Sequence, residues 1–199
     1  MISAIGVGIA VCMTIITVYK LMADDPLPQK SDEVYTMRLD LRSEGPDDSN
    51  DPPDLMSYID ATNLMKSDIP TAMSVHYQTI SVVKSDDQNI RPFRERIRLA
   101  TRGFFTVFEP PIKYGNYWSV EEENNLEQVA VLTHSLNDRL FGGADSVGQQ
   151  IQLDGRYFKV VGVLDEWTPT PQFFETDGGV FVETEGAFLP FSLTPSLAK

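Results

Sequence analysis

The residues of this chain that could carry out chemistry are two histidines, one cysteine and scattered serines and carboxylates. His134 and Ser135 are neighbours, as a base and a nucleophile would be, but no Gly-x-Ser-x-Gly turn surrounds the serine. Cys12 lies within an apolar N-terminal segment. We therefore interpret His134 and Ser135 as residues at the start of a helix. We expect no catalytic residue and no enzymatic activity in this chain.

The histidines and carboxylates are not spaced to hold a metal ion. Zinc needs three or four ligands at close spacing, and His76 and His134 are far apart in the sequence. The segment Asp47–Asp54 is rich in carboxylates, but a calcium loop of the EF-hand type needs glycine at its sixth position, where this segment has Pro52. No Walker A loop is present, so ATP must bind elsewhere. We expect no metal and no cofactor.

The charge of the chain excludes one class of partner. The formal net charge is -13 and the isoelectric point is near 4.4, so we expect no binding to nucleic acid, which needs Lys and Arg footprints. Glu121–Glu123 is expected to be a solvated loop. Five arginines nevertheless gather in one stretch: Arg91, Arg94, Arg96, Arg98 and Arg102. They either dock an anionic group or a partner, or pair with carboxylates on a neighbouring strand, and we favour the pairing.

Aromatic residues are numerous for one short domain, and most of them should pack in a core. They include Phe104, Phe105, Phe108, Tyr114, Tyr117, Trp118, Trp167, Phe173 and Phe174. The last three follow or flank prolines in a loop. There they form either part of the core or a patch that binds a partner.

Residues Ile2–Met22 are apolar apart from Lys20 near their end. About 20 such residues at 1.5 Å per residue span a bilayer core, so we predict a transmembrane helix over residues 1–22. Its small residues would let a second helix approach, although a lone anchor is the alternative. A signal peptide fits less well, because a basic N-terminal region is absent and the cleavage site is poor. Since the chain begins almost inside this helix, we expect further sequence upstream.

Strand and helix signals follow the apolar segment. A Pro-containing linker is expected over residues 23–32, and alternation predicts a half-buried strand over Glu33–Leu41. Arg42–Asp54 is a loop rich in Asp, Pro and Ser. Helical spacing of apolar residues predicts a helix over Leu55–Lys66, with Asp54 as its N-cap.

Two long strands are predicted next, around Met73–Val82 and Pro92–Ala100. In the first of them the apolar residues change parity after Tyr77, which predicts a bulge or bend. Arg102–Phe108 is expected to be a short aromatic helix or turn, which ends at Pro110 and Pro111.

The last part of the chain carries the clearest local signals. The elements predicted there are a buried strand over Gln128–Leu132, a helix over His134–Phe141, a hairpin over Ile151–Leu164 and a last strand over Gly179–Glu183. Thr133 suits the N-cap of that helix and Gly142 suits the left-handed residue after it. Asp154-Gly155 is a strong sequence signal for a hairpin turn. The fold class is therefore α+β, with mostly antiparallel strands.

The stretch from Val129 to Leu164 closely resembles the signature of the MacB-like periplasmic core domain. In that family a buried strand leads to a helix ending in Leu-Phe-Gly, an Asp-x-Val-Gly turn follows, and a hairpin closes in Val-Val-Gly-Val. The matching residues are Leu140, Phe141 and Gly142; Asp145, Val147 and Gly148; and Val160, Val161, Gly162 and Val163. Looser matches are Ile5–Ala10, Gly103–Phe105, Gly115–Trp118 and Ala187–Phe191.

The resemblance implies a permease subunit of a MacB-type ABC exporter, in the FtsX/MacB superfamily. Its periplasmic core domain would occupy residues 33–199 and be incomplete at its C-terminus, since the family's core domain usually continues past a point like Lys199. Family permeases also carry three further membrane helices after that domain. The resemblance places it in the bacterial inner membrane with the main domain in the periplasm. ATP-driven motion of the membrane helices would reach this domain to export or extract an antimicrobial, peptide or lipoprotein.

The partners implied are a cytoplasmic ABC ATPase, a periplasmic adaptor or substrate protein, and a second permease in a homo- or heterodimer. The alternative function is a single-pass, membrane-anchored periplasmic interaction module with no transport role. The two hypotheses differ in whether three further membrane helices follow this chain in its gene.

Overall fold

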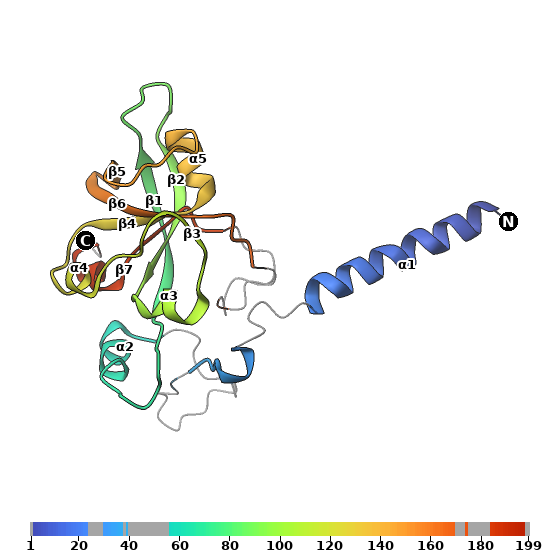
Figure 1. Cartoon of the computed structure of the whole chain (residues 1–199), viewed down its shortest axis with the longest axis horizontal. Helices are drawn as coiled ribbons and strands as arrows, with labels where there is room; N and C mark the ends of the chain where they lie inside the picture. The colour runs from blue at the N-terminus through green and yellow to red at the C-terminus, as the bar shows by residue number, and fades with distance from the viewer. Residues whose placement is uncertain are drawn as a thin grey trace, which may run out of the picture. The chain divides into compact units, whose positions relative to one another are not determined.

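The computed structural model of the chain describes residues 2–23, 30–37, 39, 56–169, 174 and 184–197 (Figure 1). The chain divides into two compact units. One comprises Met1–Asp54 and Thr168–Val182, and the other comprises Leu55–Trp167 and Glu183–Lys199. All strands of the described residues lie in the second unit. The predicted bounds of the linker, 23–32, and of the core domain, 33–199, stay a prediction.

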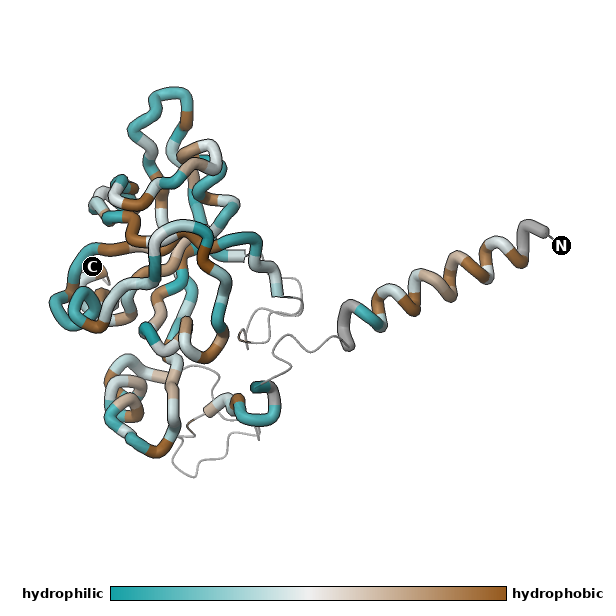
Figure 2. Tube along the Cα trace, in the orientation of Figure 1, coloured by the Kyte–Doolittle hydropathy of each residue, from teal (hydrophilic) through white to brown (hydrophobic). Residues whose placement is uncertain are grey.

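The first unit contains helix α1, Ile2–Ala23, and a 3-10 helix η1, Ser31–Glu33. Apolar side chains of α1 such as Ile5 and Val7 are 61% and 65% exposed, and Figure 2 shows hydrophobic residues along its length. In the part of the chain that the structure describes, no helix is both long and apolar enough to cross a membrane. The predicted helix is thus confirmed, whereas its membrane span is not supported by the structure.

The strand predicted over Glu33–Leu41 is wrong for the residues that the structure describes. Glu33 ends η1, and residues 34–37 and 39 belong to no strand. Alternating polarity is not enough for a strand, because its N–H and C=O groups also need a neighbouring strand to pair with. The predicted loop over residues 42–54 and the predicted strand over residues 179–183 lie outside the described residues.

The second unit begins with helix α2, Tyr58–Leu64, inside the range predicted for a helix. Its N-cap is Ser57, whose hydroxyl accepts a hydrogen bond from the backbone N–H of Asp60 at 3.2 Å. The predicted cap, Asp54, lies outside the described residues. Ser57 serves because its extended backbone places its side chain over the first free N–H groups of the helix.

Seven strands form one sheet in the order β3-β6-β4-β7-β2-β1-β5, and β5 also pairs with β6. The last pairing closes six strands into a circuit, with β3 added beside β6. The strands are β1 His76–Lys84, β2 Phe93–Ala100, β3 Ile112–Gly115, β4 Val129–Leu132, β5 Gln150–Leu153, β6 Arg156–Leu164 and β7 Ala187–Pro190. Among them only the β2–β7 and β4–β6 pairings are parallel. The predicted α+β class with mostly antiparallel strands is confirmed.

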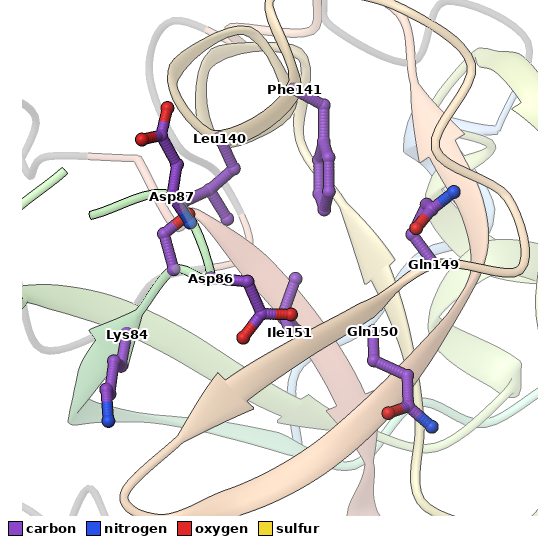
Figure 3. Close-up of a pocket in the computed structure, with 9 residues that line it drawn as sticks. Lys84, Asp86, Asp87, Leu140, Phe141, Gln149, Gln150 and Ile151 are labelled. Atoms are coloured by element: carbon purple, nitrogen blue, oxygen red, sulfur yellow. The ribbon is translucent and has the colours of Figure 1, made fainter. Parts of the chain in front are cut away.

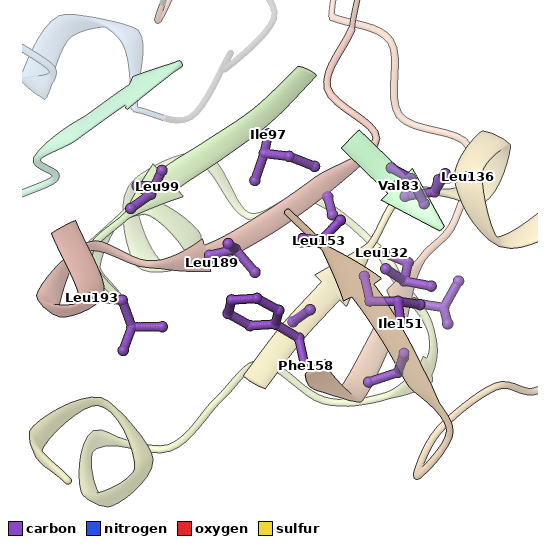
Figure 4. Close-up of a cluster of buried hydrophobic side chains, with 14 residues drawn as sticks. Val83, Ile97, Leu99, Leu132, Leu136, Ile151, Leu153, Phe158, Leu189 and Leu193 are labelled. Atoms are coloured by element: carbon purple, nitrogen blue, oxygen red, sulfur yellow. The ribbon is translucent and has the colours of Figure 1, made fainter. Parts of the chain in front are cut away.

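Apolar side chains from all six strands of the circuit meet in one core (Figure 4). The core contains Val83, Ile97, Leu99, Ala130, Leu132, Leu136, Ile151, Leu153, Phe158, Val160, Val163, Ala187, Leu189 and Leu193. Successive strand residues point to opposite faces, so each strand also has an outward face, which is the side away from this core. The core therefore fixes which residues of every strand are available to partners.

The bulge predicted in β1 is wrong. β1 pairs with β2 in continuous register from His76 opposite Ala100 to Val83 opposite Phe93. Apolar residues of both parities need no bulge, because Val83 faces the core while Ile80 and Val82 are 50% and 44% exposed on the outward face.

The hairpin and helix signals of the last part are confirmed. Asp154 and Gly155 have φ of 47° and 84° between β5 and β6, as a tight hairpin turn requires. Helix α5, His134–Phe141, starts at the N-cap Thr133 and ends at Gly142, which has φ of 62°. The other helices described are α3 Gly103–Phe108, α4 Val120–Asn124, η2 Phe191–Leu193 and α6 Thr194–Leu197.

Position 162, which lies at a register shift between β4 and β6, admits only a small residue because the backbone after β3 passes close to it. Ala130 pairs with Val160 and Val131 pairs with Gly162, so Val161 is an extra residue in β6. A Cβ at Gly162 would lie 2.2 Å from the carbonyl oxygen of Asn116. Only glycine lets these two backbone segments approach so closely.

We predict that Gly162→Ala lowers the free energy of unfolding by about 1–3 kcal/mol, the usual cost of overpacking a tight site. Lys159→Ala, an exposed residue of the same strand, is the matched control and should stay within about 0.5 kcal/mol of the wild type. Urea denaturation of the full chain measures both. Equal stability of the two variants would contradict the close approach at Gly162.

Candidate functional site

His134 and Ser135 occupy the start of α5, as the sequence predicts. The Thr133 and Ser135 hydroxyl oxygens are 3.2 Å apart, and the Thr133 hydroxyl caps the backbone N–H of Leu136. His134 is half-buried and Ser135 is exposed. The contacts described for Ser135 are those of a helix start.

His76 belongs to the packing of β1 against α3. Its Nδ1 lies 3.0 Å from the Ser74 hydroxyl, and its ring meets Phe104 edge-on at 5.2 Å between centroids. Within the described ranges, no group of three or more His, Cys, Asp or Glu side chains is arranged to hold a metal ion. The segment Asp47–Asp54, weighed as a calcium loop, lies outside those ranges. Cys12 is exposed on α1.

A buried ion pair lies among the five arginines of residues 91–102, which we call the arginine row. Arg98 is on the outward side of β2, yet its side chain is 1% exposed and that of Glu185 is 3% exposed. The Arg98 Nε donates to Glu185 Oε1, which also accepts from Gln78 Nε2 at 2.9 Å. Glu185 precedes β7, the strand beside β2. For Arg98, therefore, the interpretation as a partner of a neighbouring carboxylate is confirmed.

The other arginines of the row are dispersed. Arg96 donates to the Gln78 side-chain oxygen at 3.4 Å, and Arg94 is exposed. Arg102 donates through Nε to the Trp118 carbonyl oxygen at 3.1 Å. The structure thus divides a basic cluster of the sequence into structural residues and residues that face solvent.

The aromatic residues of α3 form a second packed layer, on the outward side of the sheet. Phe104 and Phe105 both meet Phe188 of β7, at 5.3 Å and 5.8 Å between centroids. Phe105 also packs edge-on against Trp118 at 4.7 Å and stacks on Tyr117 at 4.2 Å. Most of the predicted aromatic residues are therefore in a core, as expected.

The alternative of an aromatic patch at Trp167, Phe173 and Phe174 receives no support. Trp167 is half-buried and meets the Phe104 ring edge-on at 6.2 Å. Phe174 is 7% exposed, and Phe173 lies outside the described residues.

Glu121–Glu123 is wrong as a solvated loop, because these residues form α4. Ser119 and Glu122 make a reciprocal capping box at its start, and the pattern Ser-x-x-Glu is the sequence signal for it. Glu123 accepts from the backbone N–H of Arg102 at 3.3 Å, and its own carbonyl oxygen accepts from the Ser192 hydroxyl at 3.0 Å. Burial raises the pKa of Glu123 above its usual 4.5, and the Arg102 N–H partly opposes this.

A shallow pocket of about 220 Å³ lies between the β1–β2 turn, the end of α5 and the start of β5 (Figure 3). Leu140 and Phe141 of the Leu-Phe-Gly motif line it and also pack against the core. Of its two acidic residues, Asp87 accepts from the backbone N–H of Asn89 at 2.9 Å. The motif therefore serves packing, and the pocket presents no convergent set of groups for a reaction.

Comparison with known families decides the relationship. The family model of the MacB-like periplasmic core domain matches residues 1–197. This chain belongs to that family. The match includes α1 and all strands of the described residues. The elements first recognised in the sequence, from Val129 to Leu164, are β4, α5 and the β5–β6 hairpin of the MacB-like core domain.

Curated relatives match a part of the MacB-like core domain. The pyoverdine export ATP-binding/permease protein PvdT of Pseudomonas syringae pv. syringae is 34% identical over 85 residues, 42% of this chain and 13% of that protein. The macrolide export ATP-binding/permease protein MacB of Azoarcus sp. is 35% identical over 72 residues, 36% of this chain and 11% of that protein. The matched segment is thus a small fraction of these relatives.

Solved structures show the same fold. The periplasmic region of MacB from Actinobacillus actinomycetemcomitans matches with a TM-score of 0.53 and 15% identity, over 70% of this chain and 57% of that one. The extracellular domain of the noncanonic ABC-type transporter YknZ from Gram-positive bacteria matches with a TM-score of 0.55 and 14% identity, over 72% and 67%. At such identities the likeness establishes the fold alone.

We predict that Glu185→Ala lowers the free energy of unfolding by about 3–5 kcal/mol, because it leaves Arg98 charged, buried and without its carboxylate. The double variant Arg98→Met/Glu185→Leu should be more stable than Glu185→Ala, since it removes both charges and keeps apolar volume. Chemical denaturation, followed by the fluorescence of the buried aromatic residues, measures the free energy of unfolding of the wild type and of both variants. A double variant no more stable than the single one would show that Arg98 is not the cause.

A second prediction concerns pH. Because the pKa of Glu123 is raised in the folded state, its contribution to stability is fully present below the unfolded pKa and is lost as the pH rises through the folded pKa. Glu123→Gln removes this loss and keeps an acceptor for Arg102. The stability of this variant relative to the wild type should therefore rise as the pH increases above about 4.

Denaturation at several pH values tests the expected trend. Asn124→Ala, at an exposed residue of α4 that does not titrate, is the matched control and should keep a constant difference from the wild type. A constant difference for Glu123→Gln as well would refute the raised pKa.

Proposed function

We propose that this chain is part of the permease subunit of an ABC exporter of the MacB type. In this proposal α1 is its membrane helix, and the second compact unit, which contains all the described strands and is called the strand unit below, is its periplasmic core. The single observation that carries the proposal is the family match over residues 1–197, which runs through both α1 and the strands. The names of the relatives, which join export, ATP binding and permease, agree with it.

The construction of the strand unit suits the transmission of force. A closed circuit of strands with a packed core moves as one body, because a close-packed interior resists deformation. In the proposed mechanism, ATP-driven motion of the membrane helices reaches this body through α1 and the linker at residues 23–32. Rigid-body motion of packed elements is a common means of such coupling.

The proposed chemistry of transport lies outside these residues. The sequence has no Walker A loop, so ATP is bound and hydrolysed elsewhere, in a cytoplasmic ATPase subunit. The names of the relatives join ATP binding and permease in one protein, so the ATPase is either a separate chain or fused to the permease. In both arrangements this part of the permease is non-catalytic.

The proposed setting is the bacterial inner membrane, with the strand unit in the periplasm. Proposed partners are the ATPase, a periplasmic adaptor or substrate protein, and a second permease in a homo- or heterodimer. The transported substrate is of the kind that such exporters handle: an antimicrobial, a peptide or a lipoprotein. The alternative is a membrane-anchored interaction module without transport, in which α1 is the anchor.

The gene of this chain tests the proposal directly. Read past the codon of Lys199 and into its neighbours, it should encode three further apolar segments of about 20 residues each, and a Walker A motif in the same or an adjacent reading frame. A stop codon soon after Lys199, with no ATPase gene nearby, would refute the exporter and leave the anchored module.

A further inference from the structure

Strands β2, β1, β5 and β6 share an outward face with exposed apolar side chains at its centre. Ile80, Val82 and Tyr157 are 50%, 44% and 50% exposed. The register aligns them: Val82 lies opposite Arg94, Lys84 opposite Gln152, and Gln152 opposite Tyr157. We call the outward residues of these four strands the basic face. Exposed apolar groups grouped on one sheet face are typical of a protein contact.

The charge of the basic face is opposite to that of the chain. Its exposed cations are Lys84, Arg94 and Lys159, and no outward position of these four strands holds an acidic residue. The whole chain has a net charge of -13. A partner that fits must therefore present carboxylates around an apolar centre.

The segment at α4, residues 120–127, has this complementary chemistry. Val120 and Leu126 are 57% and 56% exposed, and Glu121 and Glu127 are exposed beside them. No Lys or Arg occurs between Lys113 and Arg139. Two carboxylates of this segment, those of Glu122 and Glu123, are held by contacts inside the fold, so the exposed pair is left to meet a partner.

We propose that the basic face of one copy of this chain binds the 120–127 segment of a second copy. Two chains of charge -13 repel one another in the majority of their relative orientations. Electrostatics therefore favours the orientations that bring the basic face, whose charge is of opposite sign, against carboxylates. Ile80, Val82 and Tyr157 then cover Val120 and Leu126. The contact is heterologous, since it joins two different surfaces. It goes beyond the proposed function and does not depend on transport.

Cross-linking of two variants tests the contact. In full-length chain in detergent, with Cys12→Ser as background, Val82→Cys is mixed with Val120→Cys and treated with a short bismaleimide. The mixture should give cross-linked dimers, and neither variant alone should do so to the same extent. Val147→Cys, at another exposed valine (40%), replaces Val82→Cys in the control mixture and reports random collision.

Charge exchange supplies a second readout on the same chains. Arg94→Glu in the Val82→Cys copy, or Glu121→Arg in the Val120→Cys copy, should lower the cross-linking yield by up to about five-fold, as for a partly screened ion pair. Mixing the two charge-reversed copies should restore it.

Each alternative occupant has its own outcome in this experiment. Preferential cross-linking of Val82→Cys to itself would mean that two basic faces meet, and would overturn the proposal. A yield equal to that of the Val147→Cys control would also overturn it, and would leave the face to a different acidic protein or to an anionic lipid surface. Reduced yield in both charge variants without recovery in the reversed pair would overturn the proposal, because opposite charge would then not bring the two surfaces together.

Discussion

The closed circuit of strands depends on the way Asp154 joins β5 to β1. Its backbone N–H donates to the Val82 carbonyl oxygen at 3.0 Å, and its carboxylate accepts from the Val82 N–H at 2.8 Å. The same residue occupies a left-handed position in the β5–β6 turn. One aspartate thus builds the hairpin and holds it against the neighbouring strand. These contacts extend the β1–β5 ladder, in which Val83 lies opposite Leu153, and so help to close the edge of β1 over the core.

Closure in turn divides the outward side of the sheet into two regions. Over β7 and the end of β2, α3 and the segment around Trp118 cover the strands with aromatic rings. There the Arg98–Glu185 pair is removed from water, and its charges are balanced by each other. Over β1 and β5 the side chains of Ile80 and Val82 stay exposed. The same alternation of residues along the strands therefore produces a structural layer at one end and a free surface at the other.

The sequence predicts those parts of the fold that rest on local chemistry. Thr133, Gly142 and Asp154-Gly155 determine a cap, a helix end and a turn through their own backbone preferences, and each is found where it is expected. The capping box at Ser119 is equally local, and the prediction of a solvated loop over Glu121–Glu123 is wrong because it overlooks this signal. Periodicity gives a wrong prediction where a strand needs partners that are remote in sequence, as at residues 34–37.

The arginine row shows the same limit for the candidate site. Period-2 spacing places Arg94, Arg96 and Arg98 on one face correctly, yet the fate of each depends on what the topology brings beside it. Glu185 is 87 residues away along the chain from Arg98, and no pattern in the sequence connects them. Arg98 is buried because the strand order places β7 beside its end of β2, where it lies opposite Phe188. Arg94, at the other end of β2, stays exposed. A charge motif therefore becomes a structural pair or a binding surface only through non-local topology, and in this fold one strand carries both.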